Sequence, residues 1–245
     1  MKKDHSSIRC EGHGNAQAAY VCMHIFESPT QRWFGSFPEA NNLWPDAWCF
    51  SCQASFLREG EWNERNEIDL KVKTICNGCY TEARCQSVLY PDEAEKTRWD
   101  GYLDSCCAEL ERKQEKFRRD FGIDKYRRWD WDQATGQLVF SNKNVPAVIA
   151  DFVFIGSFST ISNTWLWAWA NFGLAENLRA QMLEVRNVGE RENFPYLAEG
   201  RWSADEEHGW HMAAVAVHVL GAIGVYRTPG ETGATFLALT GAKKV

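Results

Sequence analysis

Pairs of cysteine residues at metal-ligand spacing occur in the first third of the sequence. CFSC contains Cys49 and Cys52, and CNGC contains Cys76 and Cys79. A two-residue spacer lets a tight turn direct two thiolates at one zinc ion. These two motifs together could therefore supply a tetrahedral site made of four sulfur atoms.

Two earlier pairs combine a thiolate with an imidazole donor. CEGH contains Cys10 and His13, and CMH contains Cys22 and His24. Eight donors in four pairs are enough for two zinc ions, and alternate pairs could share an ion. The spacing does not decide which pairs share one, so one or two structural ions are expected. Unrelated thiols are the alternative, and it is stronger for the earlier pairs because CxH is a less common ligand spacing.

The predicted zinc is structural rather than catalytic. A catalytic zinc keeps one coordination position open for water, whereas four complete pairs leave none open. The sequence contains no HExxH motif and no HxE motif paired with PCxxC. A segment this short and polar would fold largely because the metal holds it together. Cys85, Cys106 and Cys107 lack partner spacing, so core or surface thiols are expected there.

The charge pattern argues against nucleic acid as a partner. The chain of 245 residues has a formal net charge of -6, which divides into -2, -1 and -3 over residues 1–85, 86–127 and 128–245. Recognition of a nucleic-acid backbone needs a basic stripe, and none of these segments supplies one.

The sequence also predicts a cytoplasmic protein that does not enter a membrane. The opening residues, MKKDHSSIRC, lack the apolar run of a signal peptide. The longest apolar stretch, residues 212–226, is interrupted by His218 and is too short to span a bilayer. Because the cytosol keeps thiols reduced, the cysteines are not expected to form disulfides.

The metal motifs need a scaffold, and the sequence predicts two domains. VLYPDEAEK, residues 88–96, indicates a boundary because Pro91 ends one element and a charged run follows. We expect a small zinc-stabilised Cys/His module over residues 1–88 and an α+β domain over residues 89–245.

Alternation and helical periodicity predict the first elements of the second domain. Apolar residues at helical spacing indicate an amphipathic helix over residues 97–121. A β-hairpin is expected over 127–142, followed by strands over 147–159 and 164–171. A closing pair of strands is expected around PGETG.

Two further helices complete this domain. One is expected from Leu174 to near Gly189. The other begins in SADE, where Ser203 would be the N-cap and Glu206 would close a capping box. Strands interrupted by helices favour an α+β fold in which a mostly antiparallel sheet packs against about three helices.

Tryptophans are abundant, and their spacing suggests core positions. In TWLWAWAN, alternate positions of a strand would place Trp165, Trp167 and Trp169 on one face. An all-apolar strand is usually buried on both faces, which favours the core over a binding platform. In the first domain, three more indoles are expected to cover the metal, with a binding role as the alternative. They are Trp44, Trp48 and Trp62.

Other residues capable of chemistry form no recognisable catalytic motif. His208 and His211 could share a metal, whereas His218 is expected to be a hydrogen-bonded core histidine. Asp151 lies in an apolar strand, where a buried carboxyl group could act as an acid or base. A structural hydrogen bond is the favoured interpretation of this residue. The alternative function is therefore a hydrolase-like enzyme with a cleft near Asp151, Trp165 and His211.

Several segments carry a resemblance to known families. WDWDQATGQLVFS, ADFVFIGSFSTISNTWLWAWAN and GAIGVYR resemble a bacterial domain family of unknown function. CEGHG, VCMH, DAWCFSC and ICNGCY resemble a small Cys/His module at the N-terminus of varied bacterial proteins. Such proteins are similar to immunity proteins encoded beside secreted toxins. The resemblance implies a protein toxin from the neighbouring gene as the partner, and it supplies no catalytic residues.

The favoured hypothesis is a non-catalytic binding protein that blocks a toxin by occluding its active site. It rests on the acidic composition, the closed metal sites and the resemblance. The expected contact surface is an acidic, aromatic rim. Its candidate residues are Glu61, Trp62, Glu64, Glu206 and Glu207.

Overall fold

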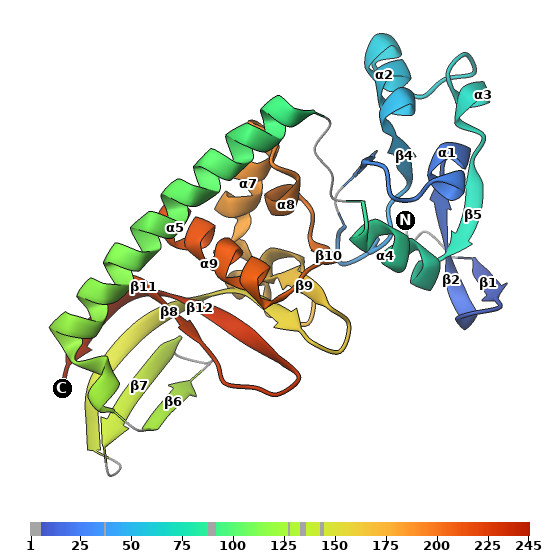
Figure 1. The fold of residues 1–245 in the computed structure, drawn as a ribbon. Helices are drawn as coiled ribbons and strands as arrows, with labels where there is room; N and C mark the ends of the chain where they lie inside the picture. Colours follow the sequence, from blue (N-terminus) through green and yellow to red (C-terminus); the bar gives the residue numbers. More distant parts are fainter. Residues whose placement is uncertain (1–5, 37, 88–91, 127, 133–135, 143–144) are drawn as a thin grey trace. The chain divides into compact units, whose positions relative to one another are not determined.

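The structure, a computed structural model, divides the chain into two compact units, Met1–Pro91 and Asp92–Val245. It describes residues 6–36, 38–87, 92–126, 128–132, 136–142 and 145–245 (Figure 1). The predicted boundary after residue 88 falls in residues 88–91, outside the described residues. Both units contain helices and mainly antiparallel strands, so the predicted α+β class is confirmed.

The first unit contains a five-stranded sheet and short helices. The strands are β1 (Ser7–Cys10), β2 (Gly14–Val21), β3 (Trp33–Gly35), β4 (Ala47–Cys49) and β5 (Lys73–Cys76). The helices are α1 (Met23–Glu27), α2 (Phe50–Glu59), α3 (Glu67–Leu70) and α4 (Asn77–Cys85). The sheet order is β1-β2-β4-β3, with β5 also paired to β2, and the β2–β4 pair is parallel.

Thiols make up an unusual share of the core in this unit. Cys22, Cys49 and Cys52 are buried among a few apolar residues that include Ile25 and Tyr80. Three half-buried indoles pack against this cluster, as the sequence predicts. They are Trp44, Trp48 and Trp62. The apolar core is small, and a metal ion held by the thiols would add to its stability.

The second unit contains one seven-stranded antiparallel sheet. Its strands are β6 (Arg128–Asp132), β7 (Gln137–Asn142), β8 (Val145–Ser159), β9 (Thr164–Trp167), β10 (Arg201–Ser203), β11 (Gly224–Arg227) and β12 (Gly233–Lys244). Strand β8 pairs with β12 along one edge, whereas its other edge pairs with β7 at one end and β9 at the other. The predicted hairpin, the long strand and the closing pair are therefore confirmed, with turn residues 133–135 outside the described residues.

The helices of this unit are one long helix and several shorter ones. They are α5 (Glu93–Phe121), α6 (Glu176–Ala180), α7 (Leu183–Glu192), α8 (Pro195–Ala198) and α9 (Glu206–Leu220). Helix α5 begins four residues before the predicted start because Asp92 caps it and accepts a hydrogen bond from the Glu95 amide. It ends at Gly122, which has a left-handed backbone with a φ of 62°.

The tryptophan-rich segment is core, but only half of it is a strand. Trp165, Trp167 and Trp169 are all buried, which confirms the predicted core position. Strand β9 ends at Trp167, and Ala168–Ala170 form a 3-10 helix, so the predicted strand over 164–171 is wrong beyond Trp167. The pairing of β9 with its neighbours also ends here. Its last pairs are Trp167 with Gly156 of β8 and Leu166 with Arg201 of β10.

The expected single helix from Leu174 to Gly189 is wrong. Two helices, α6 and α7, occupy this region, and α7 continues through Gly189 to Glu192, with Asn193 as a left-handed C-cap at a φ of 56°. A Cβ at Gly189 would lie 2.7 Å from the Ala198 backbone nitrogen. This glycine therefore permits close packing of α8 and does not end a helix.

The predicted cap of α9 is also wrong by two residues. Ser203 belongs to β10, and Asp205 is the N-cap. The Asp205 carboxylate accepts a hydrogen bond from the His208 amide at 2.9 Å, and the Asp205 amide donates to His208 Nδ1 at 3.3 Å. A histidine therefore takes the place that glutamate usually has in a capping box, which the sequence rule does not anticipate.

Helix α9 lies between α5 and the sheet (Figure 1). Its Ala- and Val-rich middle, residues 212–217, is fully buried, as expected for a helix covered on more than one side. Gly209 marks its closest approach to the sheet, where an added Cβ would lie 2.9 Å from the Phe236 ring. An added Cβ at Gly101 on α5 would meet nothing within 4 Å.

These two helical glycines predict opposite effects of the same substitution. Gly209→Ala should lower the free energy of unfolding by about 1–3 kcal/mol because the ring in the core must shift. Gly101→Ala should raise it by about 0.5–1 kcal/mol through helix propensity. Urea unfolding followed by circular dichroism measures both. Equal shifts in the two variants would contradict this packing of α9.

Candidate metal centres

The eight predicted ligands form two groups of four, and the pairing is nested. The outer centre contains Cys10, His13, Cys76 and Cys79, which come from the first and last pairs. The inner centre contains Cys22, His24, Cys49 and Cys52, which come from the second and third pairs. In each group the ligand atoms lie within 4.8 Å of one another. The spacing left the pairing open, and the structure groups the pairs neither as a four-sulfur site from CFSC and CNGC nor as alternate pairs.

Strand pairing explains why CNGC joins the first pair and not CFSC. Strand β5 pairs with β2 so that Cys76 lies opposite Ala18, beside the β1–β2 hairpin that carries Cys10 and His13. Gly14 gives this hairpin a left-handed residue with a φ of 67°. Such long-range pairing is not encoded in the spacing of the motifs.

The outer centre has the dimensions of a tetrahedral zinc site. His13 Nδ1 lies 3.6 Å from Cys10 Sγ, 3.3 Å from Cys76 Sγ and 3.6 Å from Cys79 Sγ. The Cys10 and Cys79 sulfur atoms are 3.7 Å apart. Ordinary zinc bond lengths would place tetrahedral donors about 3.6 Å apart for S–N and about 3.8 Å for S–S. The donors therefore already surround a point that zinc fits.

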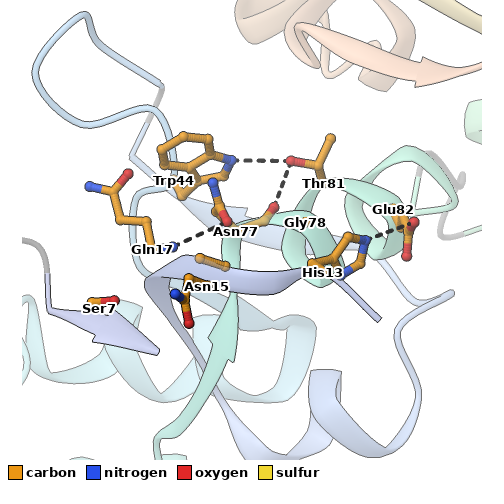
Figure 2. Close-up of a pocket in the computed structure, with 10 residues that line it drawn as sticks. Ser7, His13, Asn15, Gln17, Trp44, Asn77, Gly78, Thr81 and Glu82 are labelled. Atoms are coloured by element: carbon orange, nitrogen blue, oxygen red, sulfur yellow. Dashed lines mark hydrogen bonds and ion pairs between the residues drawn. The ribbon is translucent and has the colours of Figure 1, made fainter. Parts of the chain in front are cut away.

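Neighbouring groups orient the outer ligands. The His13 Nε2 atom lies 3.1 Å from the Glu82 carboxylate, which leaves Nδ1 to face the sulfur atoms (Figure 2). A Cβ at Gly78 would lie 2.5 Å from the His13 ring, so glycine is required there. Glu82 was not a predicted site residue, although its position three residues after Cys79 on α4 provides a signal for it.

The inner centre uses strand ends and helix starts. Cys22 follows β2 and caps α1, and its sulfur accepts a hydrogen bond from the Ile25 amide at 3.4 Å. The Cys22 amide donates to Ala47 on β4, which draws β2 toward the strand that ends in Cys49. His24 Nδ1 lies 3.6 Å from Cys49 Sγ and 3.4 Å from Cys52 Sγ. These distances also match a tetrahedron around zinc.

Crowding of the thiols separates their pKa values. In the outer centre, a hydrogen bond with His13 lowers the pKa of Cys10 to about 6, while burial and a hydrogen bond with Cys76 raise that of Cys79 to about 12. The His13 pKa rises to about 9 because its ring interacts with Cys10 and Glu82. In the inner centre, burial and a hydrogen bond with Cys49 raise the pKa of Cys52 to about 12. A divalent cation would remove this conflict by neutralising several thiolates together.

The donor chemistry limits both the metal and its role. Three soft thiolates and one imidazole at each centre are compatible with zinc, which takes such ligands in tetrahedral sites. Four protein donors fill a tetrahedron, so an ion held by all of them would have no position for a reacting water. Each centre therefore has the chemistry of a scaffold.

A polar pocket of about 690 Å³ lies beside the outer centre (Figure 2). Several of its lining groups already bond one another. The Trp44 indole donates to the Thr81 hydroxyl at 3.1 Å, and that hydroxyl donates to the Asn77 carbonyl at 2.8 Å. The Gln17 amide donates to the Asn77 side chain at 3.3 Å. The Gln17 bond joins β2 to α4 and the Trp44 bond joins residue 44 to α4, so these polar groups have a structural role.

The three residues of the predicted enzyme cleft differ in their exposure and contacts. Asp151 is exposed and accepts a hydrogen bond from Gln137 at 3.2 Å, so it makes the favoured structural hydrogen bond and is not a buried acid or base. Trp165 has no exposed surface, and it therefore cannot touch a substrate. His211 lies on α9, 3.9 Å from Glu207.

Each of the three histidines of α9 lies next to an acidic side chain. His208 belongs to the capping box, and its ring centroid is 6.2 Å from that of His211. His218 is exposed and not a core residue, and its Nδ1 lies 2.6 Å from the Glu109 carboxylate on α5. This contact with His218, together with Lys113, lowers the pKa of Glu109 to about 2. The histidines therefore have local structural contacts.

The predicted partner-binding residues lie on both units. Glu61 and Glu64 are exposed, whereas Trp62 packs edge-on against Trp48 with ring centroids 5.2 Å apart. On the second unit, Glu207 is exposed, and Glu206 accepts a hydrogen bond from Arg227 at 2.7 Å. Their role in binding stays a prediction.

The structure thus defines an α+β chain with two potential metal centres in its N-terminal unit. A family model matches residues 100–242, and the chain therefore belongs to DUF6882, a family of unknown function. No curated protein and no solved structure matches the chain. Within the described ranges, no helix combines the length and apolar character needed to cross a membrane.

The nested pairing predicts how zinc content responds to paired substitutions. The purified chain should contain about two zinc ions. Cys10→Ser with Cys76→Ser removes two ligands from one centre and should release about one ion, whereas Cys10→Ser with Cys22→Ser weakens both centres and should release up to about two. Elemental analysis after gel filtration measures this difference.

Cys107→Ser is the matched control, because Cys107 is a free thiol in neither group. It should retain both ions. Nested pairing would be contradicted if the Cys10/Cys76 variant lost both ions while the Cys10/Cys22 variant lost only one.

Proposed function

We propose that this chain is a non-catalytic cytoplasmic binding protein whose N-terminal unit is folded by two structural zinc ions. The observation that carries the proposal is the set of four protein donors at each centre. An ion bound by all four would have no open coordination position and would only hold strands and helices together. A unit that relies on metal for its core is free to use its surface for recognition.

The exposed side chains of this unit support a binding role. Large apolar residues are exposed here although the unit is small, which is a feature of interaction surfaces. They are Tyr20, Phe26, Phe50, Leu57, Ile68 and Val72. Glu61 and Glu64 add exposed negative charge. Together these side chains favour a partner that carries both basic and apolar groups.

The partner that we propose is a protein toxin encoded by the neighbouring gene, whose active site this chain would occlude. The proposal takes the partner from the sequence resemblance to immunity proteins. The acidic composition supports it, since a toxin that acts on a polyanion or a membrane surface carries basic residues that an acidic protein can cover.

Co-expression with the neighbouring gene product tests this function. We expect the two chains to co-elute in gel filtration and the toxicity of the neighbour to be suppressed. Glu61→Arg with Glu64→Arg should weaken the complex by roughly tenfold, mainly through slower association at low salt. Surface plasmon resonance at two salt concentrations measures the change.

Glu231→Arg is the matched control, because Glu231 is an exposed acid outside the proposed surface. It should leave association unchanged. A harmless neighbour, or two chains that elute separately, would remove the support for an immunity function.

A further inference from the structure

A second pocket of the N-terminal unit combines aromatic walls with acidic side chains. It has a volume of about 360 Å³ and lies next to the inner centre, away from the polar groups of the first pocket. Its residues come from the end of β2, from β4 and from the segment that contains α3. They are Tyr20, Val21, Cys22, Asp46, Ala47, Trp48, Trp62, Glu67, Leu70 and Val72.

The floor of this pocket is apolar and fixed. Val21, Cys22 and Ala47 are each almost completely buried, and Cys22 is a ligand of the inner centre. Such a floor suits the methylene groups of a long side chain, which gain from leaving water even when their end is charged.

The walls are aromatic rings held by other contacts. Trp48 and Trp62 meet edge-on at 85°, and both rings pack against Phe56. The Trp48 indole nitrogen donates to Gln53 at 2.7 Å, so its hydrogen bond is already made. Tyr20 adds a ring that is 38% exposed. Electron-rich ring faces attract cations, and tryptophan does so most strongly.

The charged residues that line the pocket have one sign. Asp46 and Glu67 are exposed, and no side-chain hydrogen bond or ion pair engages either carboxylate within the described part of the chain. Lys71 and Lys73 flank Val72 in sequence, yet neither lines the pocket. Two unpaired carboxylates beside aromatic rings favour a cation and repel an anion.

We propose that this pocket binds a lysine or arginine side chain of a protein partner, with its methylenes on the apolar floor and its charged end between the rings and the two carboxylates. The primary ammonium and the guanidinium both donate hydrogen bonds that Asp46 and Glu67 can accept, which a quaternary ammonium cannot do. The volume is at the lower end for ligand sites, which suits one side chain better than a cofactor. The proposal deepens the binding function proposed above by naming the chemistry of the partner.

Short capped peptides provide the probe. The zinc-loaded full chain is titrated with acetyl-Ala-Lys-Ala-amide, acetyl-Ala-Arg-Ala-amide and acetyl-Ala-norleucine-Ala-amide. Indole N–H resonances, assigned with Trp48→Phe and Trp62→Phe variants, report binding. We expect the two cationic peptides to shift the Trp48 and Trp62 signals in a saturable manner, and the neutral norleucine peptide to bind roughly 5- to 30-fold more weakly.

Substitution of the carboxylates tests the pocket without removing its walls. Asp46→Asn with Glu67→Gln should weaken the cationic peptides roughly 5- to 30-fold and leave the norleucine peptide unchanged. Glu27→Gln with Glu39→Gln is the matched control, because it removes the same charge from exposed residues of the same unit that neither line the pocket nor belong to the proposed contact surface. It should leave all three affinities unchanged.

Three outcomes would overturn the proposal. They are the absence of any saturable shift, equal binding of the norleucine peptide, and equal losses in the two double variants, which would indicate general charge attraction.

The Asp46/Glu67 variant in the toxin assay separates this proposal from the immunity function. If peptides bind as expected and no toxin complex forms, only the immunity function fails. If the toxin complex forms with equal affinity in wild type and variant, the pocket is not the contact.

Discussion

The convergence of eight donors on two points is the constraint on which the N-terminal unit depends. Its strands are three to eight residues long, and cysteines occupy core positions that a larger domain would fill with leucine or valine. Thiols in such close contact cannot all lose their protons without a cation, as the separated pKa values of Cys10 and Cys79 illustrate. A dication held by these donors would replace this repulsion with bonds between strands and helices that have few other contacts.

The stability of the second unit comes from its buried apolar surface. Helix α9 is covered by α5 on one side and the sheet on the other, and its small residues permit this close packing. Trp165 and Trp167 fill the space beneath it with ring centroids 5.3 Å apart. Burial of indoles contributes on the order of 1.5–3 kcal/mol each, which a core of this size can accumulate without a ligand. The family match over residues 100–242 lies entirely within this unit and includes none of the N-terminal unit.

The sequence predicted those features that depend on neighbouring residues and missed those that depend on distant ones. The identities of the eight donors follow from local spacing, and the β6–β7 hairpin follows from alternation around a turn. The nested pairing could not be predicted, because it depends on β5 pairing with β2 across more than fifty residues of chain. Asp151 is exposed although β7 and β12 pair with β8 on either side of it, because side chains of a strand alternate between the two faces of the sheet and Asp151 lies on the solvent face.

The inner centre and the aromatic pocket are connected through three consecutive residues of β4. Side chains on a strand alternate between its faces, so Cys49 can reach the metal while Trp48 points the other way toward the pocket. Cys22 contributes to both, since its sulfur faces the centre and its residue lines the pocket floor. An ion that fixes Cys22 and Cys49 therefore also fixes the backbone that carries Trp48 and Ala47. Zinc at this position would preorganise a recognition site and reduce the entropy lost on binding, which gives a closed metal centre a functional role without any chemistry at the metal.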